Sequence, residues 1–278
     1  MKVGCMLALL ALSLAPMPTH AIEATQGDVL ALPIQQSKQQ PDLFCLQRHW
    51  PVLPAGKGRW RGWLGIDLRT PPATYTCHWR SDHRQWDTKL TVHAGHFRIS
   101  RITVRKAMAE FDPATLSRIR REVRALKQCY GMHVPSRPDQ IRMQLPVQGI
   151  ESTPFGARRF VNGVERSPHS GIDIAAPLGT PVHAPLGGKI LYVANMYLNG
   201  NTVVIGHGLG LVSVLSHMSQ VKVRTGDWVR TGDIVGTVGQ TGRATGPHLH
   251  WSVRFRHARV NPHSLLPERA LAGEENLP

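Results

Sequence analysis

Three short motifs in the C-terminal half of the chain carry histidines at spacings suited to a metal site. They are His169-Ser170-Gly171-Ile172-Asp173, Ser216-His217-Met218-Ser219 and His248-Leu249-His250. Because alternate side chains of a strand share one face, we expect His248 and His250 to point the same way. One imidazole of this pair can bind a metal ion, at about 2.0–2.1 Å, while the other lines the same pocket. The pair alone would equally fit two solvated histidines, so a metal site needs further ligands.

The first motif supplies those further ligands. His169 and Asp173 would lie about 13 Å apart on a flat strand. Gly171 between them allows a turn or a bulge that brings the two side chains together. Two imidazoles and one carboxylate make an open three-ligand site with a fourth position for water. Since imidazole ligands favour zinc over calcium or magnesium, the sequence predicts one Zn²⁺ per chain.

The second motif provides acid/base chemistry. A zinc-activated water that attacks an amide needs a base for its proton and a donor for the developing oxyanion. The sequence has no His-Glu-x-x-His motif, so no glutamate is placed for this work. We therefore assign His217 and His248 as the acid/base pair. The predicted metal ligands are then His169, Asp173 and His250.

The region that carries these motifs is predicted to be an antiparallel β domain spanning residues 149–267. Apolar runs of a few residues alternate with glycine turns, and no helical period is present. The predicted strands cover residues 189–193, 202–205, 211–215, 234–238 and 249–255. Residues 268–278 are expected to be a C-terminal tail.

Residues 22–131 are predicted to form an accessory β domain that ends in a helix. Near-alternate apolar residues over 60–68 and 89–104 indicate a small β-sandwich. Asp112-Pro113 is typical of a helix start, and the helix is expected to end near Tyr130-Gly131. Residues 132–148 hold three prolines and are predicted to be a linker. The expected fold class is therefore mainly β.

The N-terminus and the charge bear on location. Lys2 followed by an apolar run over 3–15 is typical of a secretory signal, predicted here as residues 1–21, and the run is too short to span a bilayer. We expect an exported protein, periplasmic or secreted, with no transmembrane segment.

The formal net charge is +15, from 33 Lys and Arg against 18 Asp and Glu. Export and the scattered basic residues argue against nucleic acid, so the expected partner is an anionic cell envelope.

Few cysteines remain once the signal is removed. These are Cys45, Cys77 and Cys129, an odd number for an oxidising compartment. At most one disulfide can form within the chain, and the sequence leaves its pairing open.

Residues 152–266 resemble the LytM/lysostaphin-type zinc endopeptidases of bacterial cell walls. The likeness is carried by Ser152-Thr153-Pro154-Phe155-Gly156, His169-Ser170-Gly171-Ile172-Asp173, Pro181-Val182-His183-Ala184-Pro185, His207-Gly208-Leu209-Gly210, His217-Met218-Ser219 and Gly242-Arg243-Ala244-Thr245-Gly246-Pro247-His248-Leu249-His250. The resemblance implies that His169, Asp173 and His250 bind zinc and that His217 and His248 are catalytic. It also implies that the protein hydrolyses amide bonds in peptidoglycan cross-linking peptides, with zinc-bound water as the nucleophile. The N-terminal half is similar to the accessory β domain of exported members from double-membraned bacteria.

The chain departs from that family at three places. Leu215 stands where an aromatic residue is usual, and His183 stands where tyrosine is common. Phe160 or Asn162 occupies the region of an oxyanion-stabilising tyrosine. An alternative function is a catalytically silent LytM-type module that binds and activates a cell-wall amidase, but such modules lose zinc ligands. The residues leave open the bond that is cut, the organism whose wall is cut, the oligomeric state, and whether the N-terminal domain covers the cleft or tethers the enzyme.

Overall fold

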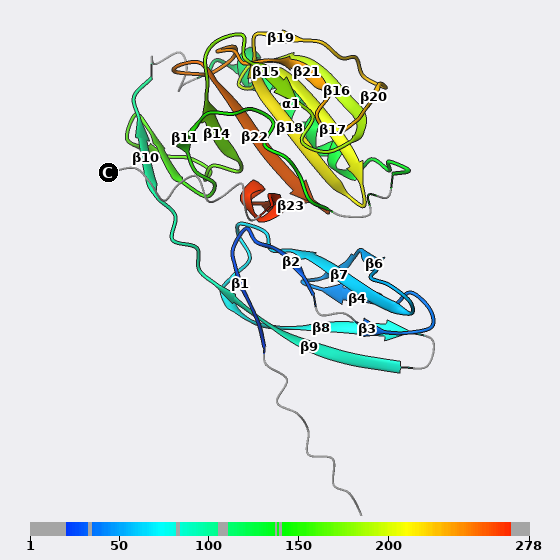
Figure 1. The fold of residues 1–278 in the computed structure, drawn as a ribbon. Coiled ribbons are helices and arrows are strands. Elements are labelled where there is room, and N and C mark those ends of the chain that lie inside the picture. The colour runs from blue at the N-terminus through cyan, green and yellow to red at the C-terminus, as the bar shows by residue number, and fades with distance from the viewer. Residues whose placement is uncertain are drawn as a thin grey trace, which may run out of the picture.

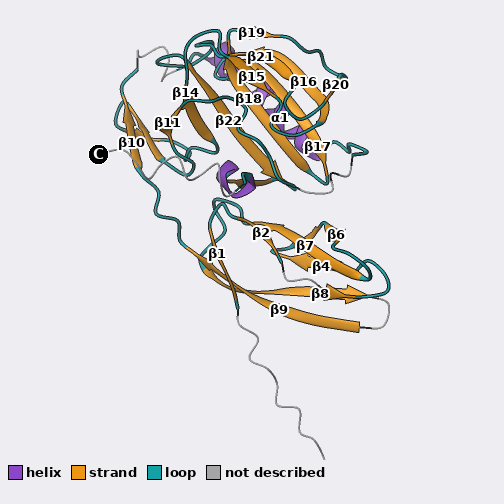
Figure 2. Ribbon diagram, in the orientation of Figure 1, coloured by secondary structure: helices purple, strands orange, loops and turns teal. Residues whose placement is uncertain are grey.

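The computed structural model describes residues 21–32, 35–81, 84–104, 111–136, 138 and 141–267. The predicted signal, apart from Ala21, and the predicted tail lie outside these residues. The described chain is mainly β, as expected, with the N-terminal sheets lying below a larger C-terminal sheet in Figures 1 and 2. No helix in the described part is long and apolar enough to cross a membrane.

The N-terminal part is a β-sandwich, which confirms the predicted architecture. Its five-stranded sheet has the order β1 (Ile22–Thr25), β9 (Arg84–His93), β8 (Ala73–Ser81), β4 (Asp42–Cys45), β5 (Arg48–Trp50). The facing sheet consists of β2 (Val29–Ala31), β7 (Arg59–Gly65), β3 (Gln35–Gln36) and β6 (Val52–Pro54). The two sheets approach closely at Gly62 on β7, where an added Cβ would lie 2.5 Å from the Trp79 ring and 2.7 Å from Leu43. A larger side chain at Gly62 would therefore separate the layers.

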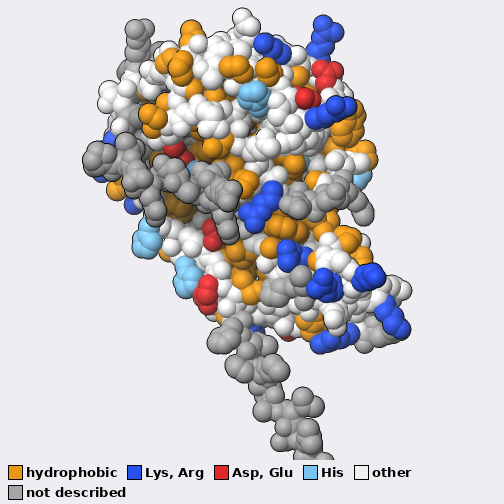
Figure 3. Space-filling view, in the orientation of Figure 1, with side chains coloured by type: hydrophobic (Ala, Val, Ile, Leu, Met, Phe, Trp, Pro, Cys, Tyr) orange, Lys and Arg blue, Asp and Glu red, His pale blue; other side chains and the backbone are white. Residues whose placement is uncertain are grey.

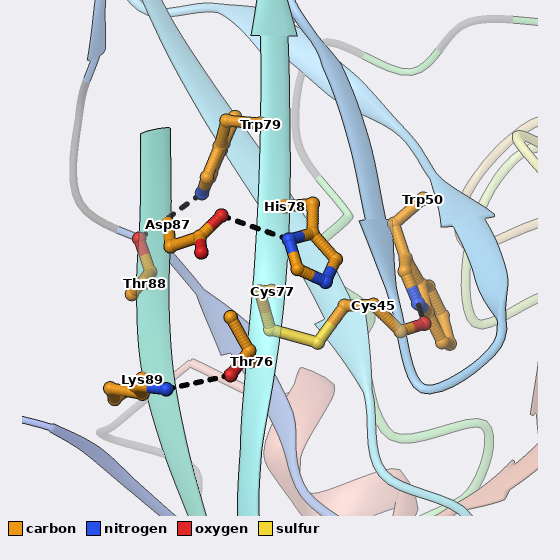
Figure 4. Close-up of a disulfide and its surroundings, with 9 residues drawn as sticks. All are labelled: Cys45, Trp50, Thr76, Cys77, His78, Trp79, Asp87, Thr88 and Lys89. Carbon is orange, nitrogen blue, oxygen red and sulfur yellow. Dashed lines mark hydrogen bonds and ion pairs between the residues drawn. A yellow bond between two sulfur atoms is a disulfide. The ribbon is translucent and has the colours of Figure 1, made fainter. Parts of the chain in front are cut away.

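A disulfide joins two neighbouring strands of the five-stranded sheet. Cys45 at the end of β4 pairs with Cys77 on β8. Trp50 donates its indole N–H to the Cys45 carbonyl at 2.9 Å, beside the bridge in Figure 4. Cys129 stays reduced and is buried elsewhere, so the open pairing question is answered.

The C-terminal part is built on an antiparallel eight-stranded sheet. Its order is β11 (Ile150–Thr153), β14 (Ile172–Ala175), β22 (His248–Phe255), β18 (Leu211–Met218), β17 (Gly200–Gly208), β16 (Gly188–Met196), β20 (Trp228–Val229), with β23 (Ala258–Val260) paired to β22. Two three-stranded sheets flank it: β15 (Pro181–His183), β21 (Ile234–Thr237) and β19 (Gln220–Val221), and β10 (Ile99–Ile102), β12 (Arg158–Val161) and β13 (Val164–Glu165). A 3₁₀ helix, Pro262–Leu265, follows β23.

The predicted helix exists but belongs to the other half of the molecule. α1 (Pro113–Gly131) begins as expected, with the Asp112 carboxylate accepting the Thr115 backbone N–H at 2.8 Å. Instead of packing on the sandwich, α1 contacts β16, β17 and β18. Its buried residues Leu126 and Cys129 share a core with Val204 and Val212 of that sheet. The physical reason is that this apolar sheet face needs a cover, and the helix supplies an apolar stripe.

In the interval 132–148, predicted as a linker, the described residues are packed rather than extended. Val134, Ile141, Met143 and Val147 are all buried. The Met143 N–H donates to the Leu265 carbonyl at 2.8 Å. The prolines break helix and strand here, but the apolar residues between them still join the core, so this stretch does not act as a free tether.

Direct contacts join the sandwich to the C-terminal sheet. Asp67 forms an ion pair with Arg259, and its carboxylate also accepts the Arg259 backbone N–H at 2.8 Å. The rings of Trp50 and Phe255 lie 5.2 Å apart. Beyond the sandwich, β10 pairs in parallel with β12. The N-terminal half thus contributes a strand beside the region that carries the histidine motifs.

Candidate metal centre

Strand register brings the predicted site residues together. Asp173 on β14 lies directly opposite His250 on β22. On the other side of β22, His250 lies opposite Ser216 of β18, so His217 follows next to it. His248 lies two residues before His250 and shares its face of the strand. His169 precedes β14 and completes the group of five.

Gly171 lets His169 reach the site through a bend in the chain, in line with the turn or bulge expected there. Its backbone φ is not positive; the chain bends here and presses against β22. An added Cβ would lie 2.3 Å from the Trp251 carbonyl oxygen and 2.7 Å from the Ser252 Cβ. This close approach places the ring centroids of His169 and His250 4.8 Å apart.

Three donor atoms converge at the centre of the site. Asp173 Oδ1 lies 3.0 Å from His169 Nε2 and 2.7 Å from His250 Nδ1, and the two nitrogens are 3.0 Å apart. His169 Nδ1 lies 3.0 Å from the Pro154 carbonyl oxygen. With the Nδ1 proton donated to that carbonyl, the neutral ring directs its Nε2 lone pair at the other two atoms. A carboxylate and two imidazole nitrogens this close together need a ring proton or a metal ion between them, and a metal ion could take the place of the protons, so this donor set fits a metal ion.

Electrostatics keep the donors in the form that binds metal. Burial alone would raise the pKa of the Asp173 carboxyl, but hydrogen bonds and charge from His169 and His250 outweigh it and hold that pKa well below its usual range. Burial lowers the pKa of His250, against the pull of Asp173. The carboxylate is therefore ionised and His250 tends to stay neutral, as ligands must be.

His217 and His248 form a second pair beside the donors. Their ring centroids are 4.7 Å apart. His217 Nδ1 lies 2.8 Å from the Thr241 carbonyl oxygen, and His248 Nδ1 lies 2.8 Å from the Gly246 carbonyl oxygen. Protons on both Nδ1 atoms leave Nε2 as the accepting nitrogen of each ring. His248 Nε2 is 3.9 Å from Asp173 Oδ1, so it faces the centre.

The backbone of His217 is held in an unusual conformation. Its φ of +67° is rare for a residue with a side chain. The His217 N–H donates to the Asn199 carbonyl at 2.8 Å, which fixes this conformation. Burial, followed by the positive charge of His250, lowers the pKa of His217 to about 3. The ring is thus neutral near pH 7 and able to accept a proton.

These residues line a groove with a volume of about 420 Å³. Asp173, His217, His248 and His250 all contribute to its lining. The remaining walls come from several segments of the chain: Ser100, Val104, Ser152, Thr153, Arg159, Leu198, Asn199, Arg243, Ala244 and Thr245. An extended peptide could lie in this groove against the donors.

The residues at which the chain departs from the family that it resembles lie away from the groove lining. Asn162 holds the backbone of Val104, with its side-chain oxygen accepting the Val104 N–H at 2.9 Å. Phe160 is likewise absent from the lining, so neither residue supplies an oxyanion donor there. Leu215 is fully buried in the sheet core. His183 Nδ1 bonds the Gly232 carbonyl at 2.8 Å, outside the groove.

His207 is structural. It is fully buried, with Nδ1 3.0 Å from the Gly187 carbonyl oxygen and Nε2 2.9 Å from the Ser213 hydroxyl. Burial lowers its pKa to about 4.

Sequence reasoning missed the groups that orient the histidines and part of the groove wall. The orienting acceptors are the backbone carbonyls of Pro154, Thr241 and Gly246, which any residue type could provide. Arg159 and Arg243 line the groove. Arg243 stands inside the sequence motif that ends at His250, so its place near the site could have been predicted from that motif.

Comparison with known proteins places this geometry in context. Residues 167–262 match Peptidase family M23. The chain is 42% identical over 114 residues to DD-carboxypeptidase/endopeptidase Mpg of Neisseria meningitidis serogroup B, covering 41% of this chain and 26% of that protein. It is 40% identical over 111 residues to peptidoglycan DD-endopeptidase ShyA of Vibrio cholerae serotype O1, covering 40% of this chain and 26% of that protein. The chain thus spans about a quarter of the length of these curated relatives.

The likeness to a solved structure extends further along the chain. A crystal structure of an M23 peptidase from Pseudomonas aeruginosa is 32% identical, with a TM-score of 0.70. The match covers 87% of this chain and 94% of that one. The N-terminal sandwich and the C-terminal sheet are therefore both within the compared region.

Proposed function

The chain belongs to peptidase family M23, and on this premise we propose that it is an exported zinc-dependent endopeptidase that hydrolyses amide bonds in the cross-linking peptides of peptidoglycan. The observation that carries the proposal is the convergence of His169, Asp173 and His250 on one point, with Asp173 and His250 lining the groove beside His217 and His248. Each of the five side chains has a distinct place in this reaction.

The metal would be held by His169 Nε2, Asp173 Oδ1 and His250 Nδ1. Two imidazoles and a carboxylate are the donors of an open catalytic zinc site. A zinc ion bound there would supply Lewis-acid activation of the scissile carbonyl and of the attacking water. The Pro154 carbonyl fixes the tautomer and direction of His169, which supports metal affinity.

His217 and His248 would move the protons. Each ring donates Nδ1–H to a carbonyl and offers Nε2 to the groove. One ring accepts the proton of the attacking water at Nε2, and that proton is then passed on, directly or through the second ring, to the leaving amine. Their separation, 4.7 Å between ring centroids, lets both reach one scissile amide.

Two observations support the proposed substrate and location. The names of Mpg and ShyA describe DD-endopeptidases, so we propose a DD cross-link as the bond that is cut. The Cys45–Cys77 bridge fits an oxidising compartment, which favours export to the periplasm. On the face in Figure 3, Lys and Arg side chains gather over the N-terminal sheets at the lower right, a surface suited to an anionic envelope.

The alternative, a silent module that activates an amidase, is disfavoured because all five site positions are occupied by competent residues. Digestion of purified sacculi tests the proposal. We expect the mature chain to release cross-linked peptides as monomers, with new termini at the DD bond by mass spectrometry. A chelator should stop the release and added Zn²⁺ should restore it. Intact cross-links after digestion with zinc-loaded protein would contradict the proposal.

A further inference from the structure

Two arginines flank the metal centre on both of its sides. Arg159 on β12 and Arg243 in the loop before β22 line the groove that holds His217 and His248. Both also line a second hollow, of about 350 Å³, on the side of His169 and His250. A peptide that places its scissile bond at the donors must therefore pass these two guanidinium groups.

The lining of the two hollows is strongly cationic. Among the described lining residues, Asp173 is the single acidic side chain, and it is engaged by His169 and His250. Arg166 adds a third guanidinium to the second hollow. Burial, and then the charges of Arg159 and Arg166, lower the pKa of Arg243, so the like charges are close enough to interact. Such a wall favours a ligand that carries negative charge.

Arg159 also has a hydrogen-bond donor with no acceptor among the residues that the structure describes. Its Nε is buried and, in the described part of the chain, has no hydrogen-bond partner. Leaving a buried donor unpaired is costly, and a ligand oxygen in the groove would relieve this cost. The preceding residue differs: Arg158 is exposed, points to the other face of β12 and pairs with Glu165 at 2.9 Å.

We propose that Arg159 and Arg243 form a carboxylate-binding subsite that selects peptides with a free carboxylate beside the scissile amide. The inference rests on the proposed function and narrows its substrate class. A guanidinium group matches a carboxylate geometrically and can bind both of its oxygens. The subsite favours cross-links made through a diamino acid whose own carboxyl group is free. It disfavours an uncharged glycine bridge.

The test uses the full mature chain, loaded with metal, and a soluble cross-linked peptide in three forms. One form has all carboxylates free, the second has the carboxylate nearest the scissile amide converted to an amide, and the third has only the chain-terminal carboxylate amidated. These forms distinguish the two sources of a carboxylate. We expect the wild type to show a KM about 10- to 100-fold lower for the first form than for the second, the range for charge-assisted hydrogen bonds, and nearly equal KM values for the first and third forms. A preference set by the chain-terminal carboxylate instead would contradict the proposal.

Arg159→Gln and Arg243→Gln should each remove most of this preference. Their KM should rise about 10-fold on the preferred peptide, with kcat nearly unchanged and the amidated peptide cleaved as by wild type. Binding of the carboxylate product, measured by calorimetry, should weaken in parallel. Arg159→Lys retains the charge and should retain part of the preference. Arg158→Gln is the matched control and should behave as wild type.

Two further results would overturn the inference. If wild type cleaves all three peptides with the same KM, the subsite is refuted while the endopeptidase activity stands. If Arg159→Gln and Arg243→Gln weaken cleavage of all three peptides equally, the arginines are structural. Failure of zinc-loaded wild type to cleave any form would refute the proposed function itself, and the subsite with it.

Discussion

At the scale of single residues, the site depends on histidines whose partners differ. His169, His217 and His248 each bond a backbone carbonyl through Nδ1, which leaves Nε2 facing Asp173 and His250 in His169 and facing the groove in His217 and His248. His207 has the same residue type but a different environment, since both of its ring nitrogens are engaged inside the sheet. The hydrogen bonds of these identical side chains therefore separate the histidines proposed to be reactive from the structural one.

His207 predicts how stability depends on pH. Its pKa is about 4 in the folded protein against an ordinary value of 6.5, so the unfolded state binds more protons between these values. The stability that His207 provides is complete above about pH 6.5 and is lost as the pH falls toward 4. The loss is on the order of 3 kcal/mol. We would measure the free energy of unfolding of metal-free protein by denaturant at pH 7.5 and at pH 4.5. The difference between the two pH values should be smaller for His207→Asn than for wild type. Equal pH dependence in the two proteins would contradict this reading of His207.

At the scale of elements, the close approach of the His169 segment to β22 positions a ligand. Gly171→Ala would place a Cβ 2.3 Å from the Trp251 carbonyl oxygen, so the backbone must shift. Overpacking of this kind costs about 1–3 kcal/mol, and we expect a lower thermal midpoint together with weaker metal binding. Gly187→Ala is the control, because its added Cβ meets nothing closer than 3.4 Å. A wild-type midpoint and metal affinity in Gly171→Ala would show that this contact does not position His169.

The elements also show what sequence can predict. The strands and the helix start at Asp112-Pro113 were predictable, because period and capping are local properties. The packing partner of α1 was not, because an apolar stripe such as Leu126 and Cys129 does not specify which sheet it covers. The five side chains that the structure brings together were recognisable by type and spacing. Their orientation was not, because it depends on backbone carbonyls such as that of Thr241.

At the scale of the whole molecule, the N-terminal half forms part of the groove. Ser100 and Val104 line it, and Asn162 holds Val104 through its N–H at 2.9 Å and its carbonyl at 3.1 Å. The contacts of Asp67 and Trp50 fix the sandwich against the C-terminal sheet. These features favour an N-terminal half that restricts access to the groove over one that only tethers the enzyme to its substrate surface. A truncated chain that begins near residue 149 would not test this restriction cleanly, because Ile141 and Met143 belong to the core.

Asn162→Gly tests this restriction directly. Glycine tolerates the φ of +50° at this position, so the change removes the two hydrogen bonds without backbone strain. Each bond contributes about 1 kcal/mol, so the loss of both should raise kcat/KM on a small soluble cross-linked peptide by up to about 30-fold. The increase should be insensitive to salt, because the N-terminal half would cover the groove sterically and not through charge. An unchanged rate, together with sacculus binding that weakens in salt, would instead favour tethering.

The central claim is that His169, Asp173 and His250 hold a catalytic zinc while His217 and His248 move protons. The most direct measurement is the metal content of purified wild type and of five single alanine variants, determined by elemental analysis beside their turnover. We predict one zinc per chain in wild type, loss of zinc in the three ligand variants, and retained zinc in His217→Ala and His248→Ala with turnover reduced about 10²- to 10⁴-fold. Active wild-type protein without stoichiometric transition metal, or equal metal loss in all five variants, would contradict the account.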